Sequence, residues 1–335
     1  MRSAVTDVPD RVGVRRPTRA RRPTRERRGS SSCRHAIAAL AAPVLLSGCA
    51  LSLPPGGEGT AAYSPRVVRV VAAEDFWGSI ASQVGGAHAA VDSIIAKPET
   101  DPHAYEPTAA DARRLADAQV VVLNGAGYDP WMQRLLAADG GSPTVLDVGS
   151  LVGVPPGGNP HLWYAPAYVD RMVAAVTADL ARADPTDRSY FADREQQFEQ
   201  VGLAGYHAAI TSIRARFAGT PVGASESIVV YLCQALGLDL VTPPSFLRAV
   251  SEGTDVSAAD TATIDTQIRN RTLHAYFENT QNLTPDVQAQ VRAARAAGIP
   301  LVPVTETLQP AGATFQSWQT AQLLALSRAL VASRG

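Results

Sequence analysis

The chain has 335 residues, of which 46% are hydrophobic and 18% charged, a composition typical of folded globular proteins and long enough for more than one hydrophobic core. Residues 1–48 carry eleven Arg against Asp7, Asp10 and Glu26, whereas the rest of the chain holds 19 basic and 28 acidic residues. The acidic surplus after residue 48 argues against nucleic acid as a partner and mildly favours a cationic ligand.

The amino-terminal segment has the order of a secretory signal. An Arg-rich stretch ends at Arg34, and an apolar run over 36–46, too short to span a bilayer, precedes the small residues Ser47 and Gly48. Leu-Ser-Gly-Cys at 46–49 resembles the lipobox of bacterial lipoproteins, which implies a signal peptide over 1–48 and lipidation of Cys49. A plain secretory signal with an incidental Cys is the alternative. Residues 49–65, rich in Pro, Gly, Ser and Thr, predict a flexible tether.

The first half of the remaining chain alternates apolar runs with helical patterns. Strands are predicted over 67–73, 91–96, 120–124 and 144–148, and helices over 76–84, 109–118, 131–138 and 166–183. This alternation with short connections predicts βαβ units and a mostly parallel sheet with helices on both faces. We expect these elements to form an N-terminal lobe over 66–185.

A linking helix and a second lobe are predicted to follow. Residues 186–218 contain no convincing strand, and the pattern from about 188 to 217 predicts one long helix of roughly 45 Å. Strands are then predicted over 222–224, 238–241, 275–278 and 300–305, and helices over 228–236, 258–269, 286–297 and 316–331. The predicted fold class is α/β, with two lobes, the second over 219–333, each a mostly parallel sheet flanked by helices, bridged by one long helix. Ligands bind at the carboxyl ends of such strands, so a cleft is expected there.

Four side chains are candidates for binding a metal ion. His103 and His161 each follow a proline and precede a helix start, and such a loop presents an imidazole rigidly. Glu226 and Glu306 come directly after predicted strands, at the edge where the cleft is expected. Imidazoles and carboxylates suit divalent transition metals. The alternatives are that the histidines are hydrogen-bonded surface residues and that Glu226 caps the helix after it.

Two histidine motifs and two carboxylate motifs resemble those of a known family. Asp-Pro-His-Ala-Tyr-Glu-Pro-Thr at 101–108 and Asn-Pro-His-Leu-Trp at 159–163 are similar to the histidine motifs of the zinc- and manganese-specific solute-binding lipoproteins of ABC importers. Ser-Glu-Ser at 225–227 and Val-Thr-Glu-Thr at 304–307 resemble the other two ligand segments, and the similarity covers roughly 67–331. The resemblance implies a metal ion held by two residues from each lobe, His103, His161, Glu226 and Glu306.

The resemblance also implies partner proteins, but it does not decide which metal ion is bound. The implied partners are a membrane permease and a cytoplasmic ATPase. Many zinc-specific members have a His where this chain has Glu226, and a His-rich loop that it lacks; the fourth ligand is often Asp where it has Glu306. The set suits Zn²⁺ or Mn²⁺, with zinc slightly favoured. Asp75 and Glu106 are candidates for orienting the histidines.

The expected function is therefore binding without catalysis. We expect a monomer in the cell envelope, attached through the lipid on Cys49 to the outer face of the cytoplasmic membrane. A secreted metallohydrolase and a surface adhesin on the same scaffold are the alternatives. The chain contains no His-Glu-x-x-His or Gly-x-Ser-x-Gly motif to favour the hydrolase, and it offers no adhesive repeat.

Overall fold

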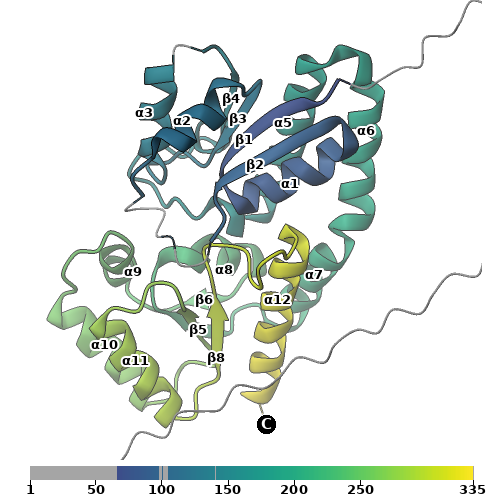
Figure 1. Cartoon of the computed structure of the whole chain (residues 1–335). Helices are drawn as coiled ribbons and strands as arrows, with labels where there is room; N and C mark the ends of the chain where they lie inside the picture. Colours follow the sequence, from purple (N-terminus) through teal and green to yellow (C-terminus); the bar gives the residue numbers. More distant parts are fainter. Residues whose placement is uncertain (1–65, 98–99, 101–104, 140, 335) are drawn as a thin grey trace, which may run out of the picture. The chain divides into compact units, whose positions relative to one another are not determined.

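The computed structural model describes residues 66–97, 100, 105–139 and 141–334, drawn in colour in Figure 1. All of them belong to one of the two units of the chain, residues 62–335. The predicted signal peptide, the tether with Cys49, and His103 lie outside the described residues. Among the helices that are described, none is long and apolar enough to cross a membrane.

The first lobe contains a parallel four-stranded sheet (Figure 1). Its strands β1 (Val68–Glu74), β2 (Ala89–Ile95), β3 (Val120–Leu123) and β4 (Thr144–Asp147) lie in the order β2-β1-β3-β4. The central strand β1 is apolar on both faces: Val70 and Ala72 join one buried cluster, Val71 and Ala73 another. A strand buried on both sides needs apolar residues throughout, so the sequence shows a continuous apolar run here.

Helices cover both faces of this first sheet. One face packs against α1 (Asp75–Gly85) and α5 (Pro166–Ala183), and the other against α2 (Ala109–Ala116) and α3 (Pro130–Asp139) (Figure 1). The short helix α4 (Val148–Val152) and the 3₁₀ turns η1 (Gly86–His88), η2 (Leu162–Tyr164) and η3 (Pro185–Asp187) complete the lobe.

The long linking helix is interrupted, so the prediction of one continuous helix over 188–217 is wrong at its centre. It consists of α6 (Arg188–Gln197), a π-helical turn η4 (Phe198–Gly202) and α7 (Ala204–Phe217). Within the turn, the backbone N–H of Leu203 donates to the carbonyl of Phe198 over 2.8 Å, a five-residue spacing. Gly202 leaves room for this, because a Cβ there would lie 2.9 Å from the ring of Phe198.

The second lobe repeats the parallel arrangement. Strands β5 (Pro221–Ala224), β6 (Asp239–Leu240), β7 (Tyr276–Asn279) and β8 (Leu301–Val304) lie in the order β6-β5-β7-β8. The covering helices are η5 (Ser227–Val229), α8 (Val230–Leu236), α9 (Pro244–Ser251), α10 (Ala258–Arg269), α11 (Pro285–Ala296) and α12 (Phe315–Ala332). Two four-stranded parallel sheets with helices on both faces are the α/β architecture that the sequence predicts.

The two lobes share one hydrophobic core and several hydrogen bonds. The rings of Tyr164 in η2 and Trp318 in α12 meet edge to face, with centroids 6.0 Å apart. The hydroxyl of Tyr164 donates to the carbonyl of Thr305 over 2.9 Å, which joins the two lobes in the buried interior. Along α1 and α12, the side-chain amides of Gln83 and Gln316 exchange two hydrogen bonds of 3.0 and 2.6 Å. Contacts of both apolar and polar kinds therefore hold the lobes together.

Candidate metal centre

His161 is fully buried, and its neighbours determine which ring nitrogen carries the proton. The side-chain nitrogen of Asn159 donates to the carbonyl of Ser227 over 2.9 Å, so the amide oxygen of Asn159 faces the His161 ring. That oxygen lies 2.8 Å from Nδ1 of His161 and can only accept a hydrogen bond. Nδ1 therefore carries the proton and Nε2 the lone pair, the tautomer that a metal ligand needs.

Glu226 lies immediately before η5, yet its side chain makes no capping hydrogen bond to that turn. The carboxylate, whose residue is 1% exposed, instead accepts from the side-chain nitrogens of Asn279, at Oε1, and Asn282, at Oε2 over 2.9 Å. The hydroxyl of Ser251 lies 3.4 Å from Oε2. The side chain thus points into the site and does not serve as a helix cap.

Glu306 follows β8 and is held from both lobes. Its Oε2 accepts from the hydroxyl of Tyr128 in the first lobe over 2.8 Å, and its Oε1 from Asn279 over 2.9 Å. The Gln281 side-chain oxygen accepts from the backbone N–H of Glu306 over 2.6 Å and from that of Thr307 over 3.1 Å. Burial, followed by the charge of Glu306, raises the pKa of Tyr128 well above its usual value, so the phenol stays a donor.

His161, Glu226 and Glu306 form one cluster. One potential ligand atom from each lies within 4.8 Å of the other two, and all three residues are buried. Burial and the charge of Glu306 raise the pKa of Glu226 to about 8. A buried carboxyl group such as that of Glu226 is costly to ionise unless a positive charge joins it. The cluster therefore has the donor atoms and the electrostatic need for a divalent cation.

Of the other predicted site residues that the structure describes, neither Asp75 nor Glu106 belongs to this cluster. His103 lies outside the described residues. The carboxylate of Asp75 accepts from the backbone N–H of Leu308, at 3.4 and 3.3 Å, so it contacts the segment that carries Glu306. Glu106 is exposed.

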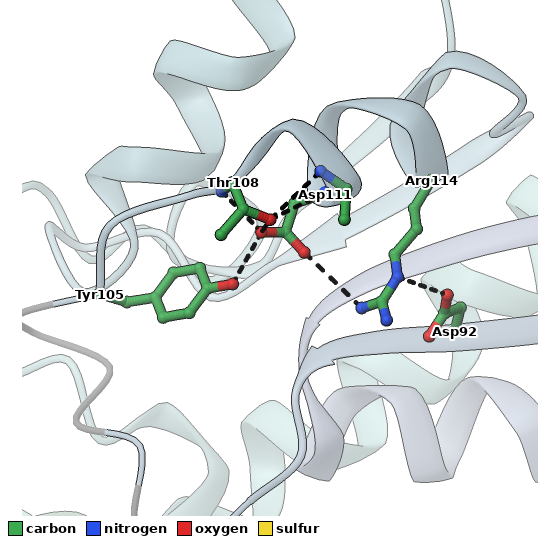
Figure 2. Close-up of polar contacts among 6 residues, drawn as sticks. Asp92, Tyr105, Thr108, Asp111 and Arg114 are labelled. Carbon is green, nitrogen blue, oxygen red and sulfur yellow. Dashed lines mark hydrogen bonds and ion pairs between the residues drawn. The ribbon is translucent and has the colours of Figure 1, made fainter.

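A hydrogen-bond network anchors the chain after residues 101–104, as Figure 2 shows. Oδ2 of Asp111 accepts from the hydroxyl of Tyr105 over 2.8 Å, and from the backbone N–H and hydroxyl of Thr108 over 2.8 and 2.7 Å. The Thr108 hydroxyl in turn accepts from the backbone N–H of Asp111, completing a capping box at the start of α2. Arg114 lies between Asp111 and Asp92, 3.7 and 3.3 Å away. The network therefore fixes residues 105–108 against the start of α2.

The supporting polar residues were not predicted from the sequence. Asn279 and Asn282 follow the apolar pair Tyr276-Phe277, and Tyr128 follows the turn after β3. The signal that was available is position. Asn279 ends β7 and Asn282 follows it, at the sheet edge that also carries Glu226 and Glu306, and Tyr128 follows β3 of the first sheet.

A cleft of about 730 Å³ reaches the cluster at Glu306. Asn159, Ser227, Ser251 and Asn282, which surround the three candidate ligands, also line this cleft. A small hydrated ion can therefore reach Glu306 through a cleft whose wall includes these four polar side chains.

The chain resembles known metal-binding proteins. Residues 70–329 match the family model described as zinc-uptake complex component A, periplasmic. The manganese-binding lipoprotein MntA of Halalkalibacterium halodurans is 26% identical over 182 residues, 52% of this chain and 59% of that protein. The zinc-binding lipoprotein AdcA of Streptococcus pneumoniae is 24% identical over 275 residues, 73% of this chain and 52% of that protein.

A solved structure has the same fold. The periplasmic zinc-binding protein TroA of Treponema pallidum superposes with a TM-score of 0.65 at 20% identity, covering 80% of this chain and 99% of that chain. The chain spans a little over half the length of the two curated relatives given above. Because the family model covers most of the chain, the chain belongs to the family of the periplasmic component A of zinc-uptake complexes, whose members are solute-binding receptors and not enzymes.

Proposed function

We propose that this protein captures a divalent transition-metal ion and delivers it to an ABC importer. The observation that carries the proposal is the buried cluster of His161, Glu226 and Glu306, with potential ligand atoms within 4.8 Å of one another. Each side chain is held by hydrogen bonds from other residues, so the donors are positioned before the ion arrives.

The proposed ligand set is His161, Glu226, Glu306 and, as the fourth member, His103. The first three supply one imidazole nitrogen and carboxylate oxygens, and a second imidazole would complete a four-coordinate set. Asp75 would support the site through the segment after Glu306, because its carboxylate accepts the N–H of Leu308. Glu106 would help to orient the imidazole of His103.

The ion is proposed to be zinc, with manganese as the alternative. A site of imidazole and carboxylate accepts both, but the intrinsic affinity of such donors is higher for zinc. The relatives that match this chain include a manganese-binding lipoprotein and a zinc-binding lipoprotein. Protons compete with the ion, so binding should weaken in acid.

Delivery is proposed to involve a membrane permease and its cytoplasmic ATPase. A lipid on Cys49 would hold the protein, as a monomer, at the outer face of the cytoplasmic membrane. The hydrogen bonds between the lobes favour release through small shifts of the lobes and not through a wide hinge opening.

Competitive titration of the purified protein with zinc and manganese tests the proposal. We expect one tightly bound ion per chain, with zinc preferred, and a large loss of affinity in His103→Ala, His161→Ala and Glu226→Ala variants. Glu252→Ala is the matched control, because Glu252 is an exposed glutamate that lines the same cleft but does not belong to the cluster.

The titration separates the parts of the proposal. Absence of stoichiometric binding in the parent protein would contradict metal capture. Binding that survives the Glu226→Ala change would mean that the ion sits elsewhere. If binding is lost in His161→Ala and Glu226→Ala but kept in His103→Ala, His103 is not one of the ligands.

A further inference from the structure

Asn279 occupies the point between the two candidate carboxylate ligands. It is the last residue of β7, which lies between β5 and β8 in the second sheet. Glu226 and Glu306 each follow the end of one of these neighbouring strands by two residues. Because the strands are parallel, their carboxyl ends meet at the same edge, and the central strand places its last side chain between the other two.

The amide of Asn279 bridges both carboxylates. Its side-chain nitrogen donates to Oε1 of Glu226 and to Oε1 of Glu306, the second over 2.9 Å, so both N–H bonds of the amide are used. The residue is fully buried. One donor group therefore sets the position of one oxygen on each carboxylate.

The orientation of this amide is fixed by its other contacts. Its oxygen accepts from the backbone N–H of Gln281 over 3.0 Å, and its backbone N–H donates to the hydroxyl of Ser225 over 3.0 Å. A flipped amide would place its oxygen against two carboxylates and would leave the Gln281 N–H without its acceptor. The surroundings permit only the orientation that points both donors at the glutamates.

Two other donors hold the opposite oxygens of the same carboxylates. Oε2 of Glu306 accepts from Tyr128, and Oε2 of Glu226 accepts from Asn282 over 2.9 Å. These donors act on one carboxylate each, whereas Asn279 is bonded to both. Without Asn279, no single donor among these three would bond to both carboxylates and set the distance between them.

We propose that Asn279 is a positioning residue for metal capture, whose amide holds Glu226 and Glu306 together at the spacing that a divalent cation requires. The proposal rests on the proposed function. Asn279 does not bind the ion itself, because its nitrogen carries two protons and no lone pair suitable for a metal. A neutral donor is suited to this position, since an Asp would add a third negative charge and a Leu would leave both carboxylates without a donor.

The test uses the full-length protein and two variants, Asn279→Ala and Asn279→Asp. Asn279→Asp keeps the shape and the acceptor for Gln281 but replaces both donors by a third carboxyl group, so it changes the polar contacts without changing the packing. The zinc Kd is measured by competition with a chelator, and the absorption spectrum of bound Co²⁺ reports the coordination geometry. We expect both variants to bind zinc about 10- to 100-fold more weakly and to show an altered Co²⁺ spectrum.

Gln290→Ala is the matched control. Gln290 is a buried amide of the same lobe that accepts from the hydroxyl of Tyr276 in β7 over 2.6 Å, away from the carboxylates. The control should lower the thermal unfolding temperature without changing the zinc Kd or the Co²⁺ spectrum, because it affects stability alone.

The results distinguish this proposal from the proposed function. If the parent protein binds no metal, metal capture itself fails. If the parent binds zinc and Glu226→Ala abolishes binding, while Asn279→Asp binds zinc as tightly as the parent or more tightly with an unchanged Co²⁺ spectrum, the positioning role alone is refuted. Should Asn279→Ala fold poorly, the isosteric Asn279→Asp variant decides.

Discussion

The carboxyl group of Glu226 should exchange a proton for the metal ion. Burial and the nearby Glu306 raise the pKa of Glu226 to about 8, so at pH 7 the metal-free protein carries a proton there. A metal ion binds the ionised carboxylate, so binding at pH 7 should release roughly one proton, and affinity should rise between pH 6 and pH 8.

Isothermal titration calorimetry in buffers of different ionisation enthalpy measures this release. The observed heat should vary linearly with the buffer's ionisation enthalpy at pH 7, and the slope should fall as the pH is raised above 8, where Glu226 is already ionised. A heat independent of the buffer at pH 7 would show that Glu226 is already ionised before the ion arrives.

A second buried carboxyl pair lies in the first lobe. Burial, followed by the charge of Asp129, raises the pKa of Glu74 well above its usual value. Asp129 accepts from the backbone N–H groups of Asn124 and Gly125, and burial raises its pKa to about 6. A carboxyl group whose pKa is raised by folding favours the folded state at low pH, and this contribution is lost as the pH rises through the folded-state pKa.

Glu74→Gln should therefore become more stable than the parent as the pH rises. The difference in free energy of unfolding should grow between pH 5 and pH 8 by at most about 1.4 kcal/mol per pH unit, the limit for one proton. Urea unfolding of metal-free protein at several pH values measures it, with Glu252→Gln, an exposed glutamate, as control. Parallel stability curves for parent and Glu74→Gln would count against a protonated Glu74.

At the scale of elements, the start of α2 depends on Asp111. Burial acts to raise the pKa of Asp111, but the hydrogen bonds from Thr108 and Tyr105 outweigh it and lower that pKa. The stabilisation that Asp111 gives is therefore present at neutral pH and is lost as the pH falls through this lowered pKa. The capping box and the Tyr105 contact both end on this one carboxylate (Figure 2).

Asp111→Ala should reduce the free energy of unfolding by about 1–3 kcal/mol, because it removes a helix cap and leaves the Tyr105 hydroxyl without its acceptor. Thermal or urea unfolding at pH 7 measures the loss. Asp92→Ala breaks only the exposed ion pair with Arg114 and should cost less than about 1 kcal/mol. Equal effects of the two substitutions would argue against the role of the capping box.

The elements also show how far sequence patterns reach. The prediction over 166–183 coincides with α5, and that over 258–269 with α10, because Pro166 and Ser257 mark the helix starts clearly. Helix α9 was missed because Pro243-Pro244 suggests a turn, yet Pro244 occupies the first helical position, where its missing N–H costs nothing. The π turn was missed because one extra residue in a helical pattern leaves the apolar spacing almost unchanged.

The site was less predictable than the elements. Glu226 and Glu306 were found because a carboxylate directly after a parallel strand is conspicuous, and the structure brings both to His161. Metal binding by these residues stays a prediction. Asn279 could not be singled out, since an Asn after a strand is usually a turn residue and sequence does not show where its amide points.

At the scale of the whole molecule, contacts between the lobes limit the motion that can release the ion. The paired amides of Gln83 and Gln316 and the bond from Tyr164 to Thr305 connect the lobes at separate places. We expect the radius of gyration from small-angle scattering to be the same, within error, for metal-free and zinc-loaded protein. Expansion of the metal-free protein by a domain-scale opening would contradict this expectation.

The aromatic ring beside His161 also has an optical consequence. All four tryptophans, Trp77, Trp131, Trp163 and Trp318, are at most 2% exposed, and the ring of Trp163 lies 5.3 Å from that of His161. Indole emission from Trp163 should therefore change when His161 takes up an ion, while the others give a steady background. Trp163 should thus report metal binding at His161 by its fluorescence, and paramagnetic Mn²⁺ and closed-shell Zn²⁺ should alter that emission differently.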